Sequence, residues 1–218
     1  MKSDAFRNFE QNLKDIDRLL EIHEDVGGTG AGRRYNLEVL NKSAIVLICA
    51  SWEAYCEDLC KEAFDHLLSS TAEPKTLPNS LKTAVASSWC EKKARNPMDY
   101  WELAGSAWRT KTRASVERIL DTFHAPKWRN LDSLFMTVLG LRDVSKSWQT
   151  RGLSVKKARD NLEKFVTMRG SLAHRAITAE SVNKSHCVDF HAHVSRLAIF
   201  TEKAVSKYMK ELVGSCPF

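Results

Sequence analysis

Apolar residues recur at intervals of three and four positions along most of the chain, as on one face of an α-helix. No segment shows the sustained alternation of apolar and polar residues that is typical of a half-buried strand. We therefore predict an all-α bundle. The expected helices cover residues 4–25, 34–70, 79–95, 98–123, 131–139, a stretch from 155 into 169–174, and 179–212, with a further turn at 143–148.

The segment 34–70 carries the widest apolar face, which predicts the central helix of the bundle. Helix-breaking and capping residues supply the other boundaries. They are Pro74 and Pro78 after the central helix, Gly140 after 131–139, Ser154 before 155, and Thr178 before the last helix.

The glycine-rich run 27–32 is the strongest break in this pattern. A phosphate-binding loop needs a strand before it and a helix opening with Lys-Ser or Lys-Thr after it. Here a predicted helix precedes the run and Arg33-Arg34-Tyr35 follow, so we interpret it as an interhelical turn.

The 218 residues suffice for one domain with a substantial core, and we predict a single domain over residues 1–218. The segment 71–125 is interpreted as a helical insert between core helices, and 179–212 as a long C-terminal helix.

Charge and cysteine usage narrow the class of protein. Lys and Arg number 33 against 27 acidic residues, a net charge of +6 that favours a polyanionic partner without proving one. The first residues form a charged amphipathic pattern rather than a secretory signal, and the longest apolar run, 44–50, is too short for a bilayer. We expect a cytoplasmic protein with six reduced cysteines, no membrane segment and no cofactor.

Arg169 and His174 form the strongest candidate for chemistry, in the segment Arg-Gly-Ser-Leu-Ala-His. An imidazole can move the proton of a ribose 2′-hydroxyl or of a departing 5′-oxygen, while a guanidinium holds the phosphate that gains charge. Such a pair is also common on solvated helix faces.

A five-residue step along an ideal helix rotates by about 140°, so the two side chains do not lie one above the other. They can share a target if the helix bends at Gly170, if the long arginine reaches around the helix, or if a two-fold dimer brings two copies to one groove.

Metal ligation is an alternative at two places, and ordinary core or surface packing is favoured at both. One is the central helix, with Cys49, Cys56, Cys60 and the carboxylates Glu53 and Glu57. The other is the C-terminal set His186, Cys187, His191 and His193. We predict no metal site.

Basic clusters with neighbouring tryptophans, Trp101 and Trp108 among them, are candidates for holding RNA. The candidate residues are Lys92, Lys93, Arg95, Arg109, Lys111 and Arg113.

Three blocks taken together resemble HEPN domains of the RiboL-PSP type. The blocks are 41–47 with 50–57 in the central helix, 122–126 with 130–135, 139–143 and 147–148 in the middle, and Arg169 to His174, which matches the Arg-x4-6-His signature.

The resemblance implies an all-α homodimer whose active members are metal-independent endoribonucleases in toxin, antiphage or RNA-processing systems, with an antitoxin or defence-system protein as a possible partner. His174 would transfer the proton and Arg169 would bind the phosphate, leaving a 2′,3′-cyclic phosphate and a 5′-hydroxyl. Glu53 and Glu57 match acidic positions that can orient the pair.

Two residues depart from the family pattern. Gly170 stands where a polar residue, commonly asparagine, is usual, and Arg175 stands where glycine is frequent. Arg175 and Ser171 are accessory candidates. The alternatives are a non-catalytic HEPN module that binds RNA, a nucleotide or a partner protein, and a purely structural helical dimer.

Overall fold

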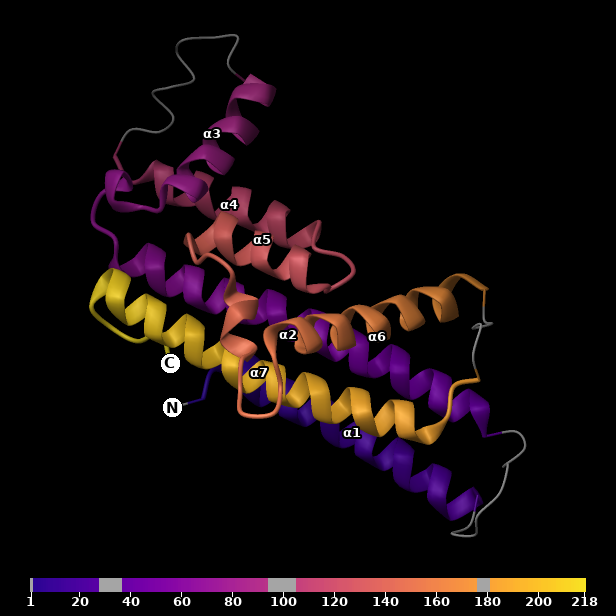
Figure 1. Cartoon of the computed structure of the whole chain (residues 1–218). Helices are drawn as coiled ribbons and strands as arrows, with labels where there is room; N and C mark the ends of the chain where they lie inside the picture. Colours follow the sequence, from indigo (N-terminus) through magenta and orange to yellow (C-terminus); the bar gives the residue numbers. More distant parts are fainter. Residues whose placement is uncertain (1, 28–36, 94–104, 176–180) are drawn as a thin grey trace.

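The computed structural model describes residues 2–27, 37–93, 105–175 and 181–218, and these ranges form the predicted all-α fold (Figure 1). The only bridge recorded in these ranges is the isolated pair Thr150–Leu153. The elements are α1 (Asp4–Gly27), α2 (Glu38–Ser70), the 3₁₀ turn η1 (Pro74–Thr76), α3 (Asn79–Lys93), α4 (Ala107–Asp121), α5 (Trp128–Leu139), the 3₁₀ turn η3 (Val144–Trp148), α6 (Val155–Arg175) and α7 (Lys184–Val213).

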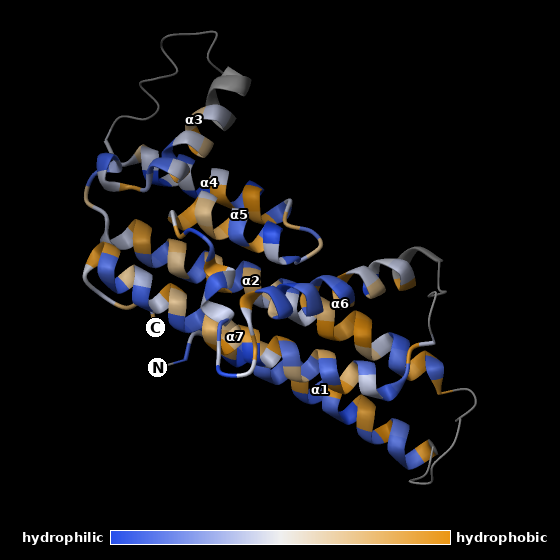
Figure 2. Ribbon diagram, in the orientation of Figure 1, coloured by the Kyte–Doolittle hydropathy of each residue, from blue (hydrophilic) through white to orange (hydrophobic). Residues whose placement is uncertain are grey.

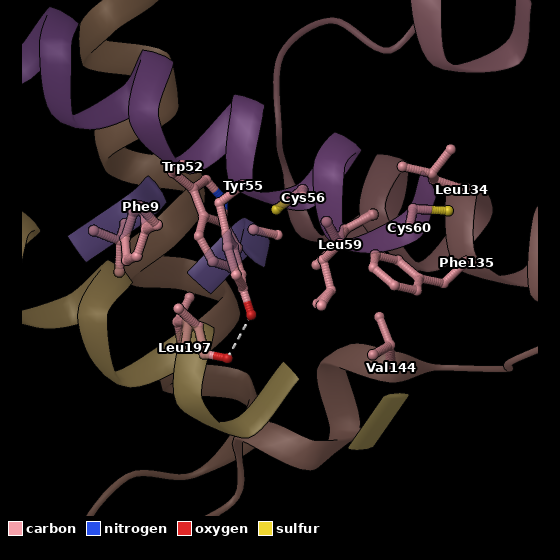
Figure 3. Packing of buried hydrophobic residues seen from close by; sticks show 14 of the residues in the cluster. Phe9, Trp52, Tyr55, Cys56, Leu59, Cys60, Leu134, Phe135, Val144 and Leu197 are labelled. Atoms are coloured by element: carbon pink, nitrogen blue, oxygen red, sulfur yellow. Dashed lines mark hydrogen bonds between the residues drawn. The ribbon is translucent and has the colours of Figure 1, made fainter. Parts of the chain in front are cut away.

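Helix α2 is the centre of the bundle, as its wide apolar face predicts. It contacts α1, α4, α5, α6 and α7. Figure 3 shows Trp52, Tyr55 and Leu59 of α2 among side chains from the surrounding helices. The Tyr55 hydroxyl donates a hydrogen bond of 2.8 Å to the carbonyl of Ala198 in α7, which satisfies the polar end of this buried ring.

Two predicted caps are confirmed. The Ser154 hydroxyl accepts a hydrogen bond of 3.2 Å from the Lys157 backbone N–H in the first turn of α6. Gly140 ends α5 with φ +79°, and a Cβ there would lie 2.9 Å from the Cβ of Pro78. Both the backbone angle and the close approach require glycine.

The predicted start of the last helix is wrong. Residues 181–183 are not helical, and α7 begins at Lys184. Asn183 is the N-cap, since its side-chain oxygen accepts a hydrogen bond of 3.1 Å from the His186 backbone N–H. Asparagine favours this position because it satisfies an amide that has no partner inside the helix. Thr178, the predicted cap, lies outside the described residues.

The helix predicted over 98–123 is shorter in the described part, because Gly105 and Ser106 form a turn before α4. Gly105 has φ +63°, a left-handed conformation that does not continue a helix. Residues 98–104 lie outside the described residues.

Helices α3, α4 and α5 gather at one end of α2 (Figure 1), and α4 contacts both α2 and α5. The Arg109 guanidinium, expected among RNA-binding groups, donates to the carbonyls of Leu68 and Thr71 at the C-terminal end of α2. A cation there stabilises the negative end of the helix dipole. Helix α4 is thus anchored to the core, and the status of segment 71–125 as an insert in one domain stays a prediction.

The helices carry both hydrophilic and hydrophobic stretches along their length (Figure 2). No helix within the described ranges combines the length and the apolar character that a membrane crossing requires.

Candidate functional site

Arg169 lies on α6, the helix that packs along one side of α2. Its side chain is half-buried, and its Nε atom is buried without a hydrogen-bond partner in the part of the chain that the structure describes. Buried donors are nearly always paired in native proteins, so an unpaired guanidinium nitrogen points to a ligand or a catalytic role.

A cleft of about 600 Å³ lies beside Arg169. Its walls come from α2, from the loop before α5 and from α6. The lining residues are Cys49, Ala125, Pro126, Lys127, Val166, Thr167, Arg169, Gly170 and Ser171. This volume falls in the range of small-ligand pockets, so the cleft can accept a nucleotide-sized group.

The loop wall of the cleft is held in a fixed shape. Ala125 has φ +56°, which is unusual for a residue with a Cβ. The Asn130 side chain donates to the carbonyls of His124 (3.2 Å) and Ala125 (2.8 Å). The buried Trp52 indole donates to the Pro126 carbonyl at 3.2 Å, and Lys127 pairs with Glu163 of α6 at 2.8 Å.

Glu53 of α2 is the acidic group beside His124. Its side chain is 20% exposed, and its Oε1 atom is 4.0 Å from Nδ1 of His124. Burial raises the pKa of Glu53, while the positive charges of Arg169 and His124 oppose that rise. The structure therefore brings Glu53 and Arg169, both candidates from the sequence, into one electrostatic group.

Glu57 lies one turn beyond Glu53 on α2. Burial, followed by the negative charges of Glu53 and Asp58, raises the pKa of Glu57 to about 7. Near neutral pH this carboxyl is therefore partly protonated, which reduces its repulsion of a bound phosphate.

Glu57→Gln is expected to stabilise the protein at pH 8 and to leave its stability nearly unchanged at pH 4. The folded-state pKa lies above the unfolded value, so the native protein holds a proton that the unfolded chain releases, and stability falls as pH rises from about 4.5 to about 7. An amide has no such titration. Urea unfolding of both proteins at the two pH values measures the effect. The prediction is contradicted if the difference in the free energy of unfolding between variant and wild type is the same at pH 4 and pH 8.

His174 occupies the last turn of α6, which ends at Arg175. Position 174 is one turn beyond Gly170, a cleft residue, and so lies on the same helix face. The side chains of His174 and Arg175 lie outside the described residues. Ser171 lines the cleft, and its hydroxyl donates 3.2 Å to the Thr167 carbonyl.

Gly170 leaves open space rather than a close approach, because a Cβ added there would meet nothing within 4 Å. No contact in the described structure requires glycine at this position. Its absent side chain instead widens the cleft beside Arg169.

The predicted basic cluster on α4 is engaged with α2. Besides the contacts of Arg109, the Arg113 guanidinium pairs with Asp65 at 2.9 Å, and Lys111 has an interaction partner as well. The side chains of Lys92, Lys93 and Arg95 lie outside the described residues. RNA binding by this set stays a prediction.

Neither set of potential metal ligands converges. In the described ranges, no three His, Cys, Asp or Glu side chains form a group that could hold a metal ion. Cys56 and Cys60 are fully buried in α2, where desolvation raises the pKa of both thiols. His193 donates to the Ala158 carbonyl at 3.0 Å, whereas His191 faces Asp17 of α1 at 3.3 Å.

Sequence reasoning missed the loop 124–127 and the stack beside it. The guanidiniums of Arg129 and Arg159 each lie 4.2 Å from the Trp128 ring centre. Arg159 also donates to the Ser145 hydroxyl at 2.7 Å, and the same hydroxyl donates to Asp132. The signal for this loop in the sequence was a histidine directly before an Ala-Pro step. It was interpreted only as part of a stretch that resembles the family.

One of three comparisons with known proteins found a match. The family model described as RiboL-PSP-HEPN matches residues 8–207, which include all the cleft residues. Searches of curated proteins and of solved structures found no match.

Proposed function

Because that match spans most of its length, the chain belongs to the RiboL-PSP-HEPN family, and from this premise we propose that it is a metal-independent endoribonuclease. The family itself suggests an RNase-like or nucleotide-related function. The finer assignment rests on the residues of the cleft.

The observation that carries the proposal is the guanidinium of Arg169. Its buried Nε atom has no partner among the described residues, and Arg169 lines a cleft large enough for a nucleotide. A planar guanidinium binds phosphate oxygens in pairs, so a phosphate in this cleft is a suitable ligand for Arg169. His174 follows on the same helix, at the position of the proton-transfer residue in the family signature.

In the proposed reaction the ribose 2′-oxygen loses its proton and attacks the adjacent phosphorus. The bond from phosphorus to the 5′-oxygen breaks, and that oxygen gains a proton. Arg169 stabilises the charge that accumulates on the non-bridging oxygens, and His174 carries one of the two proton transfers. The products are a 2′,3′-cyclic phosphate and a 5′-hydroxyl.

We further propose that the protein acts as a cytoplasmic homodimer in a toxin, antiphage or RNA-processing role. A dimer supports the chemistry because positions 169 and 174, five residues apart, are separated by about 140° around the axis of α6. A two-fold axis can bring the arginine of one protomer to the histidine of its partner.

Cleavage of RNA in EDTA tests the proposal. Purified protein is expected to cut single-stranded or structured RNA to fragments with 2′,3′-cyclic phosphate ends, and His174→Ala should lower the rate by about 10²- to 10⁴-fold while keeping the wild-type circular dichroism spectrum. Equal rates for the two proteins would overturn the assignment.

The open space at Gly170 supports a second candidate, a HEPN module that binds RNA, a nucleotide or a protein without cutting RNA. Salt-sensitive RNA binding without cleavage across pH 5–9 would favour it. Under this candidate Gly170→Asn, which introduces the usual family residue into unfilled space, has no effect on RNA integrity.

A further inference from the structure

We propose that His124 is a second catalytic residue of the cleft, transferring the proton that His174 does not. This inference rests on the proposed ribonuclease function, since it assigns a role within that reaction. It concerns a loop residue outside the Arg-x4-6-His segment and outside α6.

The reaction needs two proton transfers at different oxygens. The proton of the 2′-hydroxyl must leave as the 2′-oxygen attacks phosphorus, and a proton must reach the 5′-oxygen as its bond to phosphorus breaks. An imidazole that accepts the first proton and an imidazolium that donates the second balance the step, with no further reactant. His174 supplies one such group.

The His124 ring is placed for transfer rather than for packing. Its side chain is 78% exposed, and its Nδ1 atom faces the Glu53 carboxylate at 4.0 Å. At that distance the carboxylate attracts a protonated ring without a hydrogen bond, and Nε2, on the opposite side of the ring, stays open to a substrate. The side chain of Glu53 is four-fifths buried.

The backbone on both sides of His124 is constrained. The Asn130 side chain donates hydrogen bonds to the carbonyls of His124 and Ala125. The Trp52 indole donates one to the Pro126 carbonyl, and Ala125 itself has φ +56°. A left-handed alanine costs about 1 kcal/mol or more and persists only where its surroundings enforce it. Such enforced strain is typical of functional loops, and here it determines where His124 is presented.

His124 directly precedes a residue of the cleft wall. The next residue, Ala125, lines the cleft together with Arg169. Glu53 feels the positive charge of both Arg169 and His124, which places the three groups in one neighbourhood. The pKa of Glu57 in α2 is also lowered by the charge of His124 and raised by that of Asp121 at the end of α4. These carboxylates are the other charged groups near the ring.

Other histidines in the described part are used differently. His193 is buried and bonded to the Ala158 carbonyl, His191 faces Asp17, and His66 hydrogen-bonds the Ser215 hydroxyl at 2.9 Å on another part of α2. His66 lies near the C-terminal end of α2, more than three turns beyond Glu53, and provides a matched control.

The test compares His124→Ala with His66→Ala in the full-length protein. We expect His124→Ala to lower kcat by about 10²- to 10³-fold with RNA affinity unchanged, to remove one limb of the pH–rate profile, and to recover activity when imidazole is added. His66→Ala should match the wild type. A His124→Ala rate within about twofold of wild type, or a loss that reflects weaker RNA binding alone, would overturn the proposal.

A 5′-bridging phosphorothiolate linkage assigns the role, because a thiolate leaves without being protonated. If His124 donates to the 5′-oxygen, this substrate restores His124→Ala to within about tenfold of wild type; if His124 accepts the 2′-proton, the defect remains on both substrates. A defect on both substrates supports the acceptor role only together with the lost limb of the pH–rate profile and the recovery by imidazole.

The two proposals fail in different ways. If wild-type protein cuts RNA and His174→Ala does not, while His124→Ala remains fully active, the ribonuclease assignment stands and the role of His124 is wrong. If wild-type protein cuts no RNA, both are wrong. An NMR titration with an uncleavable 2′-deoxy oligonucleotide adds a readout independent of activity, in which the His124 ring signals should shift and those of His66 should not.

Discussion

Arg169→Ala is expected to lower kcat/KM for RNA cleavage by about 10²- to 10³-fold, the usual cost of removing one preorganised charge-stabilising donor. The fold should survive, because the buried Nε atom of Arg169 has no hydrogen-bond partner in the described structure whose own bond would be broken. The pKa of Glu53 should rise further, since Arg169 opposes the effect of burial on this carboxyl.

Arg169→Lys separates charge from geometry. Lysine keeps the positive charge but lacks the planar fork that binds two phosphate oxygens, so we expect activity between that of wild type and of the alanine variant. Arg151→Ala, at an exposed turn, is the control for loss of a positive charge.

Initial rates on one defined RNA, together with the salt dependence of binding, measure these effects. The slope of log K against log salt should fall by roughly one phosphate contact for Arg169→Ala. If Arg151→Ala reduces cleavage as strongly as Arg169→Ala, a specific phosphate site at Arg169 is ruled out.

Trp52→Ala is expected to reduce the free energy of unfolding by about 3–5 kcal/mol, the range for deleting a large buried aromatic side chain. Trp52 is fully buried, and its ring centre lies 5.7 Å from that of Tyr55 and 6.4 Å from that of Trp148. Removing it would leave a cavity in the middle of the bundle. Chemical denaturation measures the loss, and a change below about 1 kcal/mol would contradict this packing.

Trp52→Phe isolates the link from the core to the cleft. Phenylalanine keeps an aromatic ring but cannot donate to the Pro126 carbonyl, which positions the loop 124–127. Trp148→Phe is the matched control, since it also removes a buried indole donor, the one bonded to the Thr201 hydroxyl at 2.9 Å.

Both phenylalanine variants should lose roughly 1–2 kcal/mol of stability, and Trp52→Phe alone should slow RNA cleavage markedly. Equal activity of the two variants would show that the loop does not depend on this hydrogen bond. Activity is measured well below the unfolding midpoint of each variant, so that only folded protein contributes.

The helices were predictable because their signals are local. Apolar periodicity along α2 predicted a central helix, and Ser154 and Gly140 predicted boundaries that the structure confirms. The family resemblance is confirmed as well. The start of α7 was missed because Thr178 was interpreted as its cap, although asparagine is the stronger N-cap residue and Asn183 holds that position.

The contact partners of the charged side chains were not predictable in the same way. Arg109 was a candidate for RNA binding, yet its guanidinium contacts the end of α2, about forty positions earlier. In the sequence, His124 was noted only as part of a block that resembles the family. The fold places it beside Glu53. A charged group has the same sequence signature whether it faces a helix end, a carboxylate or a substrate.

The sequence by itself determined the all-α class, most helix boundaries, the family and the residue types available for proton transfer and phosphate binding. Only the tertiary structure decided that Arg169 and the loop residues Ala125 to Lys127 line one cleft, and that His124, the residue before this loop wall, lies beside Glu53. Helix periodicity depends on neighbours three and four residues away, whereas the cleft depends on how α2, α6 and the loop before α5 pack across distances of more than seventy residues.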